Sequence, residues 1–522
     1  MNTLTDYRTL GDVLRGNAAE RRDKLAFETL DGRSVTFGDF NLRVNQLNNA
    51  AAALGIAKGA RVAILSKNRP EYVEVFGLSK TGVIVVPLNW RLATSELVKL
   101  VRHSAPKMLI VDEQHLGVVE GLRAELPGVE HFVVLGSERA GWMSYEQLLQ
   151  SAFSTEPAVS VEPDDLLSLI YTSGTTGAPK GVAITHAGAL GNCRTAASEM
   201  LGLTDQDITM AVMPLFHAGG MWYHLFPSFA SGCTTLMLSE FEPGRVLEEL
   251  EARRITNVHL VPTMIASLLT HPAAATADLS GVRLLFYAAS SMPADLLRRA
   301  MHAFPSCGFA QSYGSTEAGV VTVLGPQDHR RALQPDGEHL LSSCGRPFTD
   351  REVRLVDDQG REVAAGAVGE VTVRSHDVMK GYWLNDEATR GVLHDGWLKT
   401  GDLGYFDAEG YLYIVDRKND MVVTGGENVY PTEVEGCLYR DPDVFEAAVF
   451  GVPDPQWVEK VVAVVVRKPG STVSGEELIR RLRTQLAAYK CPKAIHFAAS
   501  LPKSAAGKVL RTELRKQFGE PS

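Results

Sequence analysis

The chain has 522 residues and a mass of 56.7 kDa, with 45% hydrophobic and 22% charged residues. This length predicts roughly three to four folding units or subdomains, and the composition excludes a disordered or fibrous protein. The net charge of -10 argues against a general affinity for nucleic acid, because phosphate binding depends on clustered lysine and arginine.

The six cysteines are scattered without a Cys-x-x-Cys pair, so neither a disulfide framework nor a zinc site is predicted. The first stretch, MNTLTDYRTLGDVLRGNAAERRDK, is charged throughout and lacks an apolar signal core. No apolar run approaches the roughly 18 residues needed to cross a membrane. We therefore expect a cytoplasmic protein with reduced thiols. The sequence does not determine the oligomeric state and is compatible with a homo-oligomer.

Short apolar stretches rich in β-branched residues alternate with longer helical patterns through the first half of the chain. This alternation predicts an α/β fold of layered subdomains with largely parallel sheets. The predicted strands lie at 61–66, 82–89, 108–113, 166–171 and 234–239.

From about Ser343 strand and turn signals come closer together and predict a smaller β-rich subdomain. Beyond it we expect a buried strand at 460–468 and an amphipathic helix at 475–489. Charged residues separate two apolar strands near 416–420, and we place the domain boundary there. This predicts a large N-terminal domain of residues 1–418 and a small α+β C-terminal domain of residues 419–522.

Residues 171–181, YTSGTTGAPKG, form a loop between two predicted strands. Its glycines permit tight turns and close approach, its hydroxyls donate hydrogen bonds, and its lysine adds a cation. Such a loop suits a polyphosphate, although composition alone equally fits a hairpin with a solvated lysine. The pattern is not a Walker A box, because Gly-Lys-Ser/Thr is absent. The residues concerned are Thr172, Ser173, Gly174, Thr175, Thr176, Gly177, Lys180 and Gly181.

The whole loop resembles the phosphate-binding signature of the adenylate-forming (ANL) superfamily of acyl-CoA synthetases, nonribosomal adenylation domains and luciferases. The other motifs of that superfamily follow in order: QSYGSTE at 311–317, TGD at 400–402, DRKNDMVVTGGENVYPTEVE at 416–435 and LPKSAAGKVLR at 501–511. The chain is thus identified as a member of this superfamily, in its acyl-CoA synthetase branch. The resemblance implies that it uses ATP, Mg²⁺ and coenzyme A.

Several site residues follow from this resemblance. Tyr313, whose flat ring can stack on a purine, would pack on adenine, and Thr316 would contact phosphate. Glu317, with Thr172, would hold Mg²⁺ through hard oxygen ligands. Gly314 would lie beside both the nucleotide and the acid.

The resemblance also assigns residues nearer the C-terminus. Asp402 would accept the two ribose hydroxyls, and Arg417 is similar to the arginine that reaches the ribose. Lys508 would bridge the carboxylate oxygen and the α-phosphate during adenylation. The basic residues around Lys508 could help attract the polyanion CoA.

In this superfamily the C-terminal domain rotates between two poses about a short hinge. The hinge position here is Asn419, where Asp or Lys is usual. Gly425 and Gly426 would line the pantetheine tunnel, and Trp457 would lie beside it. Val458 stands where glycine is usual, which would narrow the passage.

The stretch PLFHAGGMWYHLF, residues 214–226, resembles the segment that carries a histidine and a wall of the acyl pocket. His217 would gate the route between acid and CoA, and Trp222 would form an apolar wall. No aspartate occurs there, which argues against an amino acid substrate. In YAASSMP, residues 287–293, Ala288 replaces a usual glycine and Ala289 follows it; both would line the pocket and shift discrimination between acids.

We therefore expect a ligase that joins an apolar monocarboxylic acid, fatty or aromatic, to CoA through an acyl-adenylate. One alternative is an adenylating enzyme that loads a carrier-protein phosphopantetheine, although the chain ends at Ser522 without a fused carrier domain. Luciferase-like oxidation shares all the motifs. A non-catalytic nucleotide or acyl-CoA binding protein is opposed by the presence of Lys508, Glu317 and Asp402.

Overall fold

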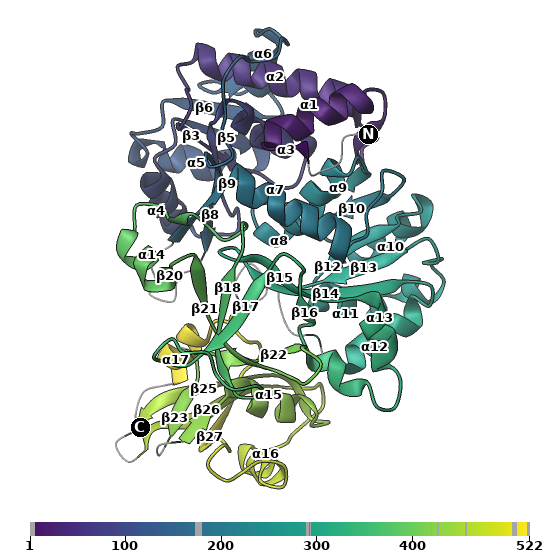
Figure 1. Cartoon of the computed structure of the whole chain (residues 1–522), viewed down its shortest axis with the longest axis vertical. Coiled ribbons are helices and arrows are strands. Elements are labelled where there is room, and N and C mark those ends of the chain that lie inside the picture. Colours follow the sequence, from purple (N-terminus) through teal and green to yellow (C-terminus); the bar gives the residue numbers. More distant parts are fainter. Residues whose placement is uncertain are drawn as a thin grey trace. The chain divides into compact units, whose positions relative to one another are not determined.

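The computed structural model describes residues 6–172, 180–288, 292, 294–418, 420–424, 427–454, 457–503 and 509–518 (Figure 1). The chain divides into two compact units. The first comprises residues 1–352 and 373–398, and the second comprises residues 353–372 and 399–522. The predicted C-terminal domain lies within the second unit, and its functional boundary at 418 stays a prediction. None of the described helices is long and apolar enough to cross a membrane.

The first unit contains two large sheets. The eight-stranded sheet has the order β19-β9-β8-β4-β3-β5-β6-β7. Strands β3, β4, β5, β6 and β8 pair in parallel, as predicted, whereas β8 and β9 form an antiparallel pair. The strands are β3 (Arg61–Leu65), β4 (Ile84–Pro87), β5 (Met108–Asp112), β6 (His131–Leu135), β7 (Met143–Ser144), β8 (Leu166–Thr172), β9 (Lys180–Thr185) and β19 (Gly381–Tyr382).

The nine-stranded sheet has the order β16-β15-β14-β13-β12-β10-β11-β1-β2. Its central pairs, from β1 to β14, are parallel, and the β14–β15 pair is antiparallel. The strands are β1 (Leu25–Thr29), β2 (Ser34–Thr36), β10 (Ile208–Ala211), β11 (Thr234–Met237), β12 (Asn257–Leu260), β13 (Leu284–Tyr287), β14 (Gly308–Ser315), β15 (Gly319–Leu324) and β16 (Arg346–Pro347).

Helices alternate with these strands along the chain, which confirms the predicted α/β layering. They are α1 (Leu10–Glu20), α2 (Phe37–Ala53), α3 (Pro70–Phe76), α4 (Thr94–Ser104), α5 (Leu116–Leu122), α6 (Tyr145–Gln150), α7 (His186–Thr195), α8 (Ala218–Gly220), the π-helical segment η6 (Met221–Leu225), α9 (Phe226–Ala230), α10 (Pro243–Ala252), α11 (Pro262–Thr270), α12 (Ala294–Ala303), α13 (Pro326–Ala332) and α14 (Asp386–Val392).

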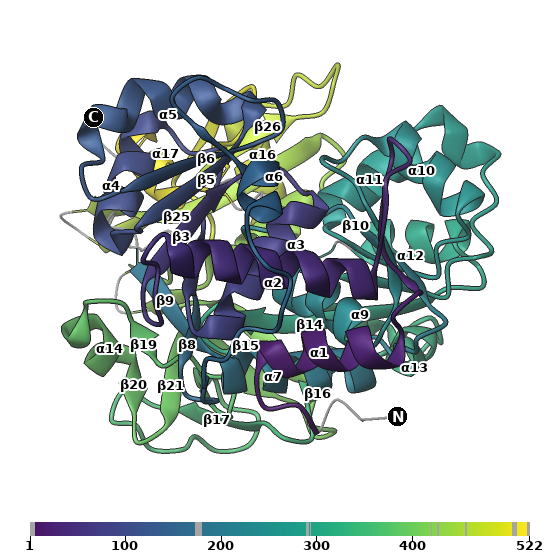
Figure 2. The same cartoon turned by 90° about the horizontal axis from the view of Figure 1, so that it is seen from above.

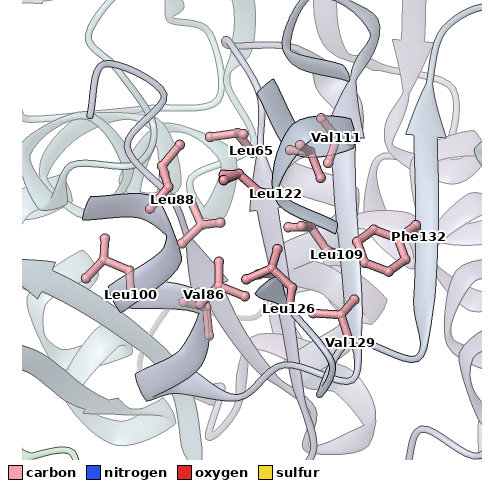
Figure 3. Close-up of a cluster of buried hydrophobic side chains, with 14 of the residues drawn as sticks. Leu65, Val86, Leu88, Leu100, Leu109, Val111, Leu122, Leu126, Val129 and Phe132 are labelled. Carbon is pink, nitrogen blue, oxygen red and sulfur yellow. The ribbon is translucent and has the colours of Figure 1, made fainter. Parts of the chain in front are cut away.

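Helices α4 and α5 cover one face of the eight-stranded sheet, beside β5 and β6 (Figure 2). Leu100 of α4 and Leu122 of α5 belong to the same buried cluster as Leu109 on β5 (Figure 3). Val62 and Ile64 point to the opposite face of β3 and are also fully buried. Both faces are therefore covered, which explains why these strands are continuous apolar runs.

The second unit begins with the predicted β-rich region, formed by β17 (Glu352–Val356), β18 (Gly369–Arg374), β21 (Trp397–Phe406) and β22 (Leu412–Arg417). In the first unit, β20 (Leu393–His394) pairs with the first residues of β21. The C-terminal sheet has the order β24-β23-β26-β25, with β27 on β26. Its elements are β23 (Val422–Thr424), β24 (Glu427–Val429), β25 (Val444–Asp454), β26 (Val458–Arg467), β27 (Ala494–Phe497), α15 (Pro431–Tyr439), α16 (Gly475–Leu482) and α17 (Arg511–Phe518).

Strand β26 is buried on both faces, as predicted for 460–468. Val461 and Val465 join a cluster that also contains residues of α15 and α16. Val462 and Val464 join a second cluster, which contains Leu514 of α17. Burial on both faces accounts for the continuous valine-rich run.

The amphipathic helix expected at 475–489 is shorter than predicted, because α16 ends at Leu482. The hydroxyl of Thr484 donates to the carbonyl of Arg481 at 2.7 Å. In a continuing helix that carbonyl would accept from the amide of residue 485, whereas the amide of Gln485 bonds to Leu482 instead. A threonine hydroxyl thus competes with the helical ladder at this point.

A buried ionic network joins α2, α3 and α6. Arg43 Nε lies 2.6 Å from Glu74 Oε1, and the Tyr145 hydroxyl donates to Glu74 Oε2 at 2.8 Å. The Glu74 side chain is only 1% exposed. Burial raises the pKa of Glu74, and the Arg43 guanidinium opposes that rise. Arg43 is therefore the cation that offsets burial of the carboxylate, and the Tyr145 hydroxyl adds a hydrogen bond.

Arg43→Met should destabilise the first unit by about 3–5 kcal/mol, because it leaves a buried carboxylate without its cation. The loss should appear as a lower urea midpoint. Arg139→Met is the matched control, because Arg139 pairs with Glu120 on the surface, with side chains 56% and 36% exposed. That pair should contribute no more than about 1 kcal/mol. Equal midpoints for the two variants would contradict the role given to Arg43.

Val458, at the start of β26, has a φ of 71°. This is the left-handed region, which β-branched residues rarely occupy. Its side chain is 69% exposed, so little packing offsets the strain. Glycine would adopt this backbone conformation without strain. Trp457 beside it is also exposed.

Val458→Gly should stabilise the start of β26 by roughly 1 kcal/mol, because glycine adopts a positive φ without steric cost. Native-state hydrogen exchange of the β25 and β26 amides would measure the gain. Val423→Gly provides the control: Val423 is an exposed residue of β23 that is not among the positive-φ residues. Glycine there should cost about 0.5–1 kcal/mol. Loss of protection in Val458→Gly would refute the strain argument.

Candidate active site

The glycine- and hydroxyl-rich loop joins two antiparallel strands. Strand β8 ends at Thr172, and β9 begins at Lys180. The hydroxyl of Tyr171, just before the loop, lies 2.7 Å from His103 Nδ1 on α4. The end of β8, just before the loop, is therefore anchored to α4. The predicted phosphate ligands Ser173, Gly174, Thr175, Thr176 and Gly177 lie outside the described residues.

The second motif lies at the end of β14 and in the turn to β15. The pairing of these strands shifts register between Tyr313 and Gly314. A Cβ atom at Gly314 would lie 2.2 Å from the carbonyl oxygen of Gly319, so only glycine fits there. The Tyr223 hydroxyl donates to the carbonyl of Ser315 at 2.7 Å. These contacts hold the turn that carries Thr316 and Glu317.

The turn meets the loop at the side chain of Glu317. Thr172 Oγ1 lies 3.5 Å from Glu317 Oε1, and the Tyr382 hydroxyl donates to the same oxygen at 3.2 Å. Lys180 Nζ lies 4.8 Å from the centre of the Tyr382 ring. Burial and Glu317 together raise the pKa of Tyr382, so its hydroxyl stays protonated as a donor. The structure thus brings the predicted residues Thr172, Lys180 and Glu317 together.

This cluster offers hard oxygen ligands. Within the described part of the chain there is no group of three or more histidine, cysteine or acidic residues that could hold a metal ion. Glu317 and Thr172 nevertheless suit Mg²⁺, which is usually held by one or two carboxylates together with substrate phosphates and water. The donor set therefore fits a metal ion that arrives with a nucleotide.

His217 caps the N-terminus of α8. Its Nδ1 accepts a hydrogen bond from the amide of Gly219 at 3.2 Å. Burial lowers the pKa of His217, so the imidazole is neutral near pH 7. Because Nδ1 is the acceptor, the ring proton lies on Nε2. His217 can therefore present a neutral N–H donor to a ligand.

Of the predicted acid pocket residues, Trp222 and Ala288 are apolar and buried, whereas His217 and Gly314 are half-buried. Trp222 contacts Phe76 and Phe226 edge to face, with ring centres 5.5 and 5.2 Å apart. Ala288 follows β13 and is buried. Ala289 lies outside the described residues. An aromatic wall thus follows His217 along the chain.

In the second unit, Asp402 of β21 lies directly opposite Arg417 of β22. Arg417 Nε is 3.0 Å from Asp402 Oδ1. The two predicted ribose ligands are therefore neighbours. Trp457 is 40% exposed, and Lys493 Nζ lies 5.7 Å from its ring centre. Asn419, Gly425, Gly426 and Lys508 are not among the residues described.

The contacts of three residues in this region escaped the sequence analysis. Tyr382 contacts Glu317, and Tyr223 holds Ser315. Asn192 of α7 donates to the carbonyl of Trp222 at 2.8 Å and accepts from the amide of Val320 at 2.9 Å. Asn192 thus connects the pocket wall to the Glu317 turn. The aromatic MKGYW stretch at 379–383 was the only local signal, and it does not indicate a partner.

Two known protein families match parts of the chain. Residues 14–383 match the AMP-binding enzyme family. Residues 433–508 match the AMP-binding enzyme C-terminal domain. The two matches together span most of both units.

Individual relatives match over nearly their whole length. A feruloyl-CoA synthase from an Amycolatopsis species is 38% identical, over 94% of this chain and 95% of the relative. A fatty acid–[acyl-carrier-protein] ligase from Streptomyces coeruleorubidus is 36% identical, over 94% and 92%. The crystal structure of an anthranilate CoA ligase in complex with anthranoyl-AMP superimposes with a TM-score of 0.88 at 32% identity, covering 99% of each chain. On these matches and the order of its motifs, the chain belongs to the AMP-binding enzyme family, in the acyl-CoA synthetase branch of the adenylate-forming superfamily.

Proposed function

We propose that this protein is an ATP-dependent carboxylic acid:CoA ligase that works through an acyl-adenylate and releases AMP and pyrophosphate. The observation that carries the proposal is the meeting of Thr172 and Tyr382 at Glu317, with Lys180 over the ring of Tyr382. A cation, a carboxylate and hydroxyls at the ends of a glycine-rich loop suit a metal-bound polyphosphate. We place the reaction in the cytoplasm, where thiols stay reduced.

The acid is an apolar monocarboxylic acid, fatty or aromatic. The edge-to-face contacts of Trp222 with Phe76 and Phe226 support this proposal, because they build a wall of aromatic rings. The names of the relatives support it as well: they activate ferulate, anthranilate and fatty acids. Between Phe216 and Pro227 no acidic side chain is available to pair with a substrate ammonium.

In the first half-reaction a carboxylate oxygen of the acid attacks the α-phosphorus of ATP, and the bond to pyrophosphate breaks. Two anions approach each other, so donors must lie where negative charge builds up. We assign the 171–181 loop and Thr316 to the phosphates, and Lys508 to the oxygen shared by acid and α-phosphate. Mg²⁺, held by Glu317 and Thr172 together with the phosphates, would neutralise charge on the polyphosphate.

Further residues would bind the adenine and the ribose of the nucleotide. Tyr313 would stack on adenine, while Gly314 keeps the neighbouring backbone close. Asp402 and Arg417, paired across β21 and β22, would bind the ribose.

In the second half-reaction the CoA thiolate attacks the acyl carbon and AMP leaves. Gly425, Gly426 and Trp457 would line the path of the pantetheine chain, and the neutral His217 would lie between acid and thiol. The mobile C-terminal domain would begin at the hinge residue Asn419.

Pyrophosphate release with Mg·ATP and CoA tests this function directly. The panel of acids should contain short, medium and long fatty acids, benzoates, cinnamates and aryl-acetates. We expect release with one chemical group, accompanied by its CoA thioester. Release of pyrophosphate without formation of a CoA thioester would indicate that a carrier protein, and not CoA, is the acceptor. No release across the panel would contradict the proposal.

Lys508→Ala should lower the rate of adenylate formation from acid and ATP by about 100-fold or more, because it removes a preorganised cation. Thioester formation from preformed acyl-adenylate should survive. Lys503→Ala is the control, since Lys503 in the same tail forms an ion pair with Glu446. Equal loss of both half-reactions in Lys508→Ala would contradict the assigned role.

A further inference from the structure

A short segment, residues 379–383, connects the turn that carries Glu317 to strand β9. The amide of Met379 donates to the carbonyl of Glu317 at 2.8 Å. Within the segment, β19 pairs with β9, and the amide of Trp383 donates to the carbonyl of Gly181 at 2.7 Å. The segment therefore fixes the backbone of the turn and the backbone of β9 relative to each other.

Tyr382, in this segment, has a well-defined backbone position. It pairs with Val182 of β9, and its amide donates to the hydroxyl of Thr389 on α14 at 2.9 Å. A Cβ atom at Gly381 would lie 2.9 Å from Thr389 Cγ2, so glycine permits this close approach. The side chain of Tyr382 thus extends from a backbone that is held on two sides.

The hydroxyl of Tyr382 contacts one oxygen of the Glu317 carboxylate. It donates to Oε1 at 3.2 Å, and Thr172 Oγ1 lies 3.5 Å from the same atom. None of the described residues donates a hydrogen bond to Oε2. Met379 bonds only to the backbone of Glu317. Tyr382 is therefore the nearer of the two described side chains that orient this carboxylate.

The ring of Tyr382 contacts the cation of the site. Lys180 Nζ lies 4.8 Å from the ring centre, which is within the range of a cation–π interaction. Among the described carboxylates, none forms an ion pair with Lys180. The ring thus holds the ammonium group without neutralising its charge. A carboxylate in the same place would compete with phosphate for this lysine, because opposite charges attract.

We propose that Tyr382 is a positioning residue of the adenylation half-reaction, with a separate role for each part of its side chain. The hydroxyl orients Glu317 for the Mg²⁺ that arrives with ATP, and the ring orients Lys180 for the phosphates. This role rests on the proposed function. One side chain thus sets the relative positions of a carboxylate and a cation, and groups that are preorganised in this way need no rearrangement during the reaction.

Tyr382→Phe tests the hydroxyl, because it keeps the ring. ATP is titrated calorimetrically into the protein without any acid, once with Mg²⁺ and once with EDTA. With Mg²⁺ the Kd for ATP should rise about tenfold, as expected for the loss of a hydrogen bond to a charged group, whereas the Kd in EDTA should equal that of the wild type. A merely structural role would raise both values alike. An unchanged Kd with Mg²⁺ would overturn the role of the hydroxyl.

Tyr382→Leu removes the ring as well. The Kd for ATP in EDTA should now rise about threefold or more above that of Tyr382→Phe, because the ammonium group loses its support. An equal Kd would overturn the role of the ring. If Tyr382→Leu does not fold, Tyr382→Met takes its place, since its longer side chain fills more of the space. In all these variants thioester formation from preformed acyl-adenylate should keep the wild-type rate, because that step does not use the triphosphate.

Tyr145→Phe is the matched control. It removes another hydrogen bond from a tyrosine to a glutamate of the first unit, the one to Glu74 at 2.8 Å. Its Kd for ATP should equal that of the wild type with Mg²⁺ and with EDTA. A weakening that depends on Mg²⁺ in this variant too would refute the specific role of Tyr382.

These binding measurements separate the role of Tyr382 from the proposed function. If the wild type binds ATP with Mg²⁺ but releases pyrophosphate with no acid, the ligase function fails, while the Kd values still decide the role of Tyr382. If the wild type forms the thioester and Tyr382→Phe binds ATP with Mg²⁺ equally well, the ligase function stands and the role of Tyr382 fails.

Discussion

The site depends on one contact between the two sheets of the first unit. Glu317, on a turn of the nine-stranded sheet, meets Thr172 and Tyr382 from strands of the eight-stranded sheet. The contact requires the turn to come close to its own strand, which glycine at 314 permits. Tyr223 then holds the turn from the side of η6. Without this contact, the loop that follows β8 and the turn that carries Glu317 would form separate surfaces.

The candidate site has charged side chains at the 171–181 loop and aromatic side chains along η6. At the ends of the loop, Lys180 and Glu317 carry the full charges that we propose for a polyphosphate and its metal ion. Along η6 the aromatic side chains of Trp222 and Tyr223 are buried, and burial keeps His217 neutral by lowering its pKa. Charged donors are most effective where water is excluded, because the local dielectric is low. The buried carboxylate of Asp377 forms an ion pair with Arg351, whose side chain is fully buried.

In the second unit, strand β26 combines a buried interior with a strained first residue. Strand β26 contributes side chains to two hydrophobic clusters, so it is a rigid element. Its first residue, Val458, has a strained backbone conformation and is exposed. Strain on a well-packed strand persists because the surrounding structure determines it, and such strain is often found at functional positions. The proposed path for pantetheine begins beside this residue, at Trp457.

The sequence by itself determined the α/β class, the parallel strands, the β-rich region and the family, because these follow from local periodicity and ordered motifs. It also indicated Glu317, Thr172 and Lys180. Only the tertiary structure decided that α16 stops at Leu482, that Tyr382 bonds to Glu317 across 65 residues and that Asn192 reaches Val320 across 128. Such partners depend on strand order in two sheets, a long-range outcome of folding that local patterns do not contain.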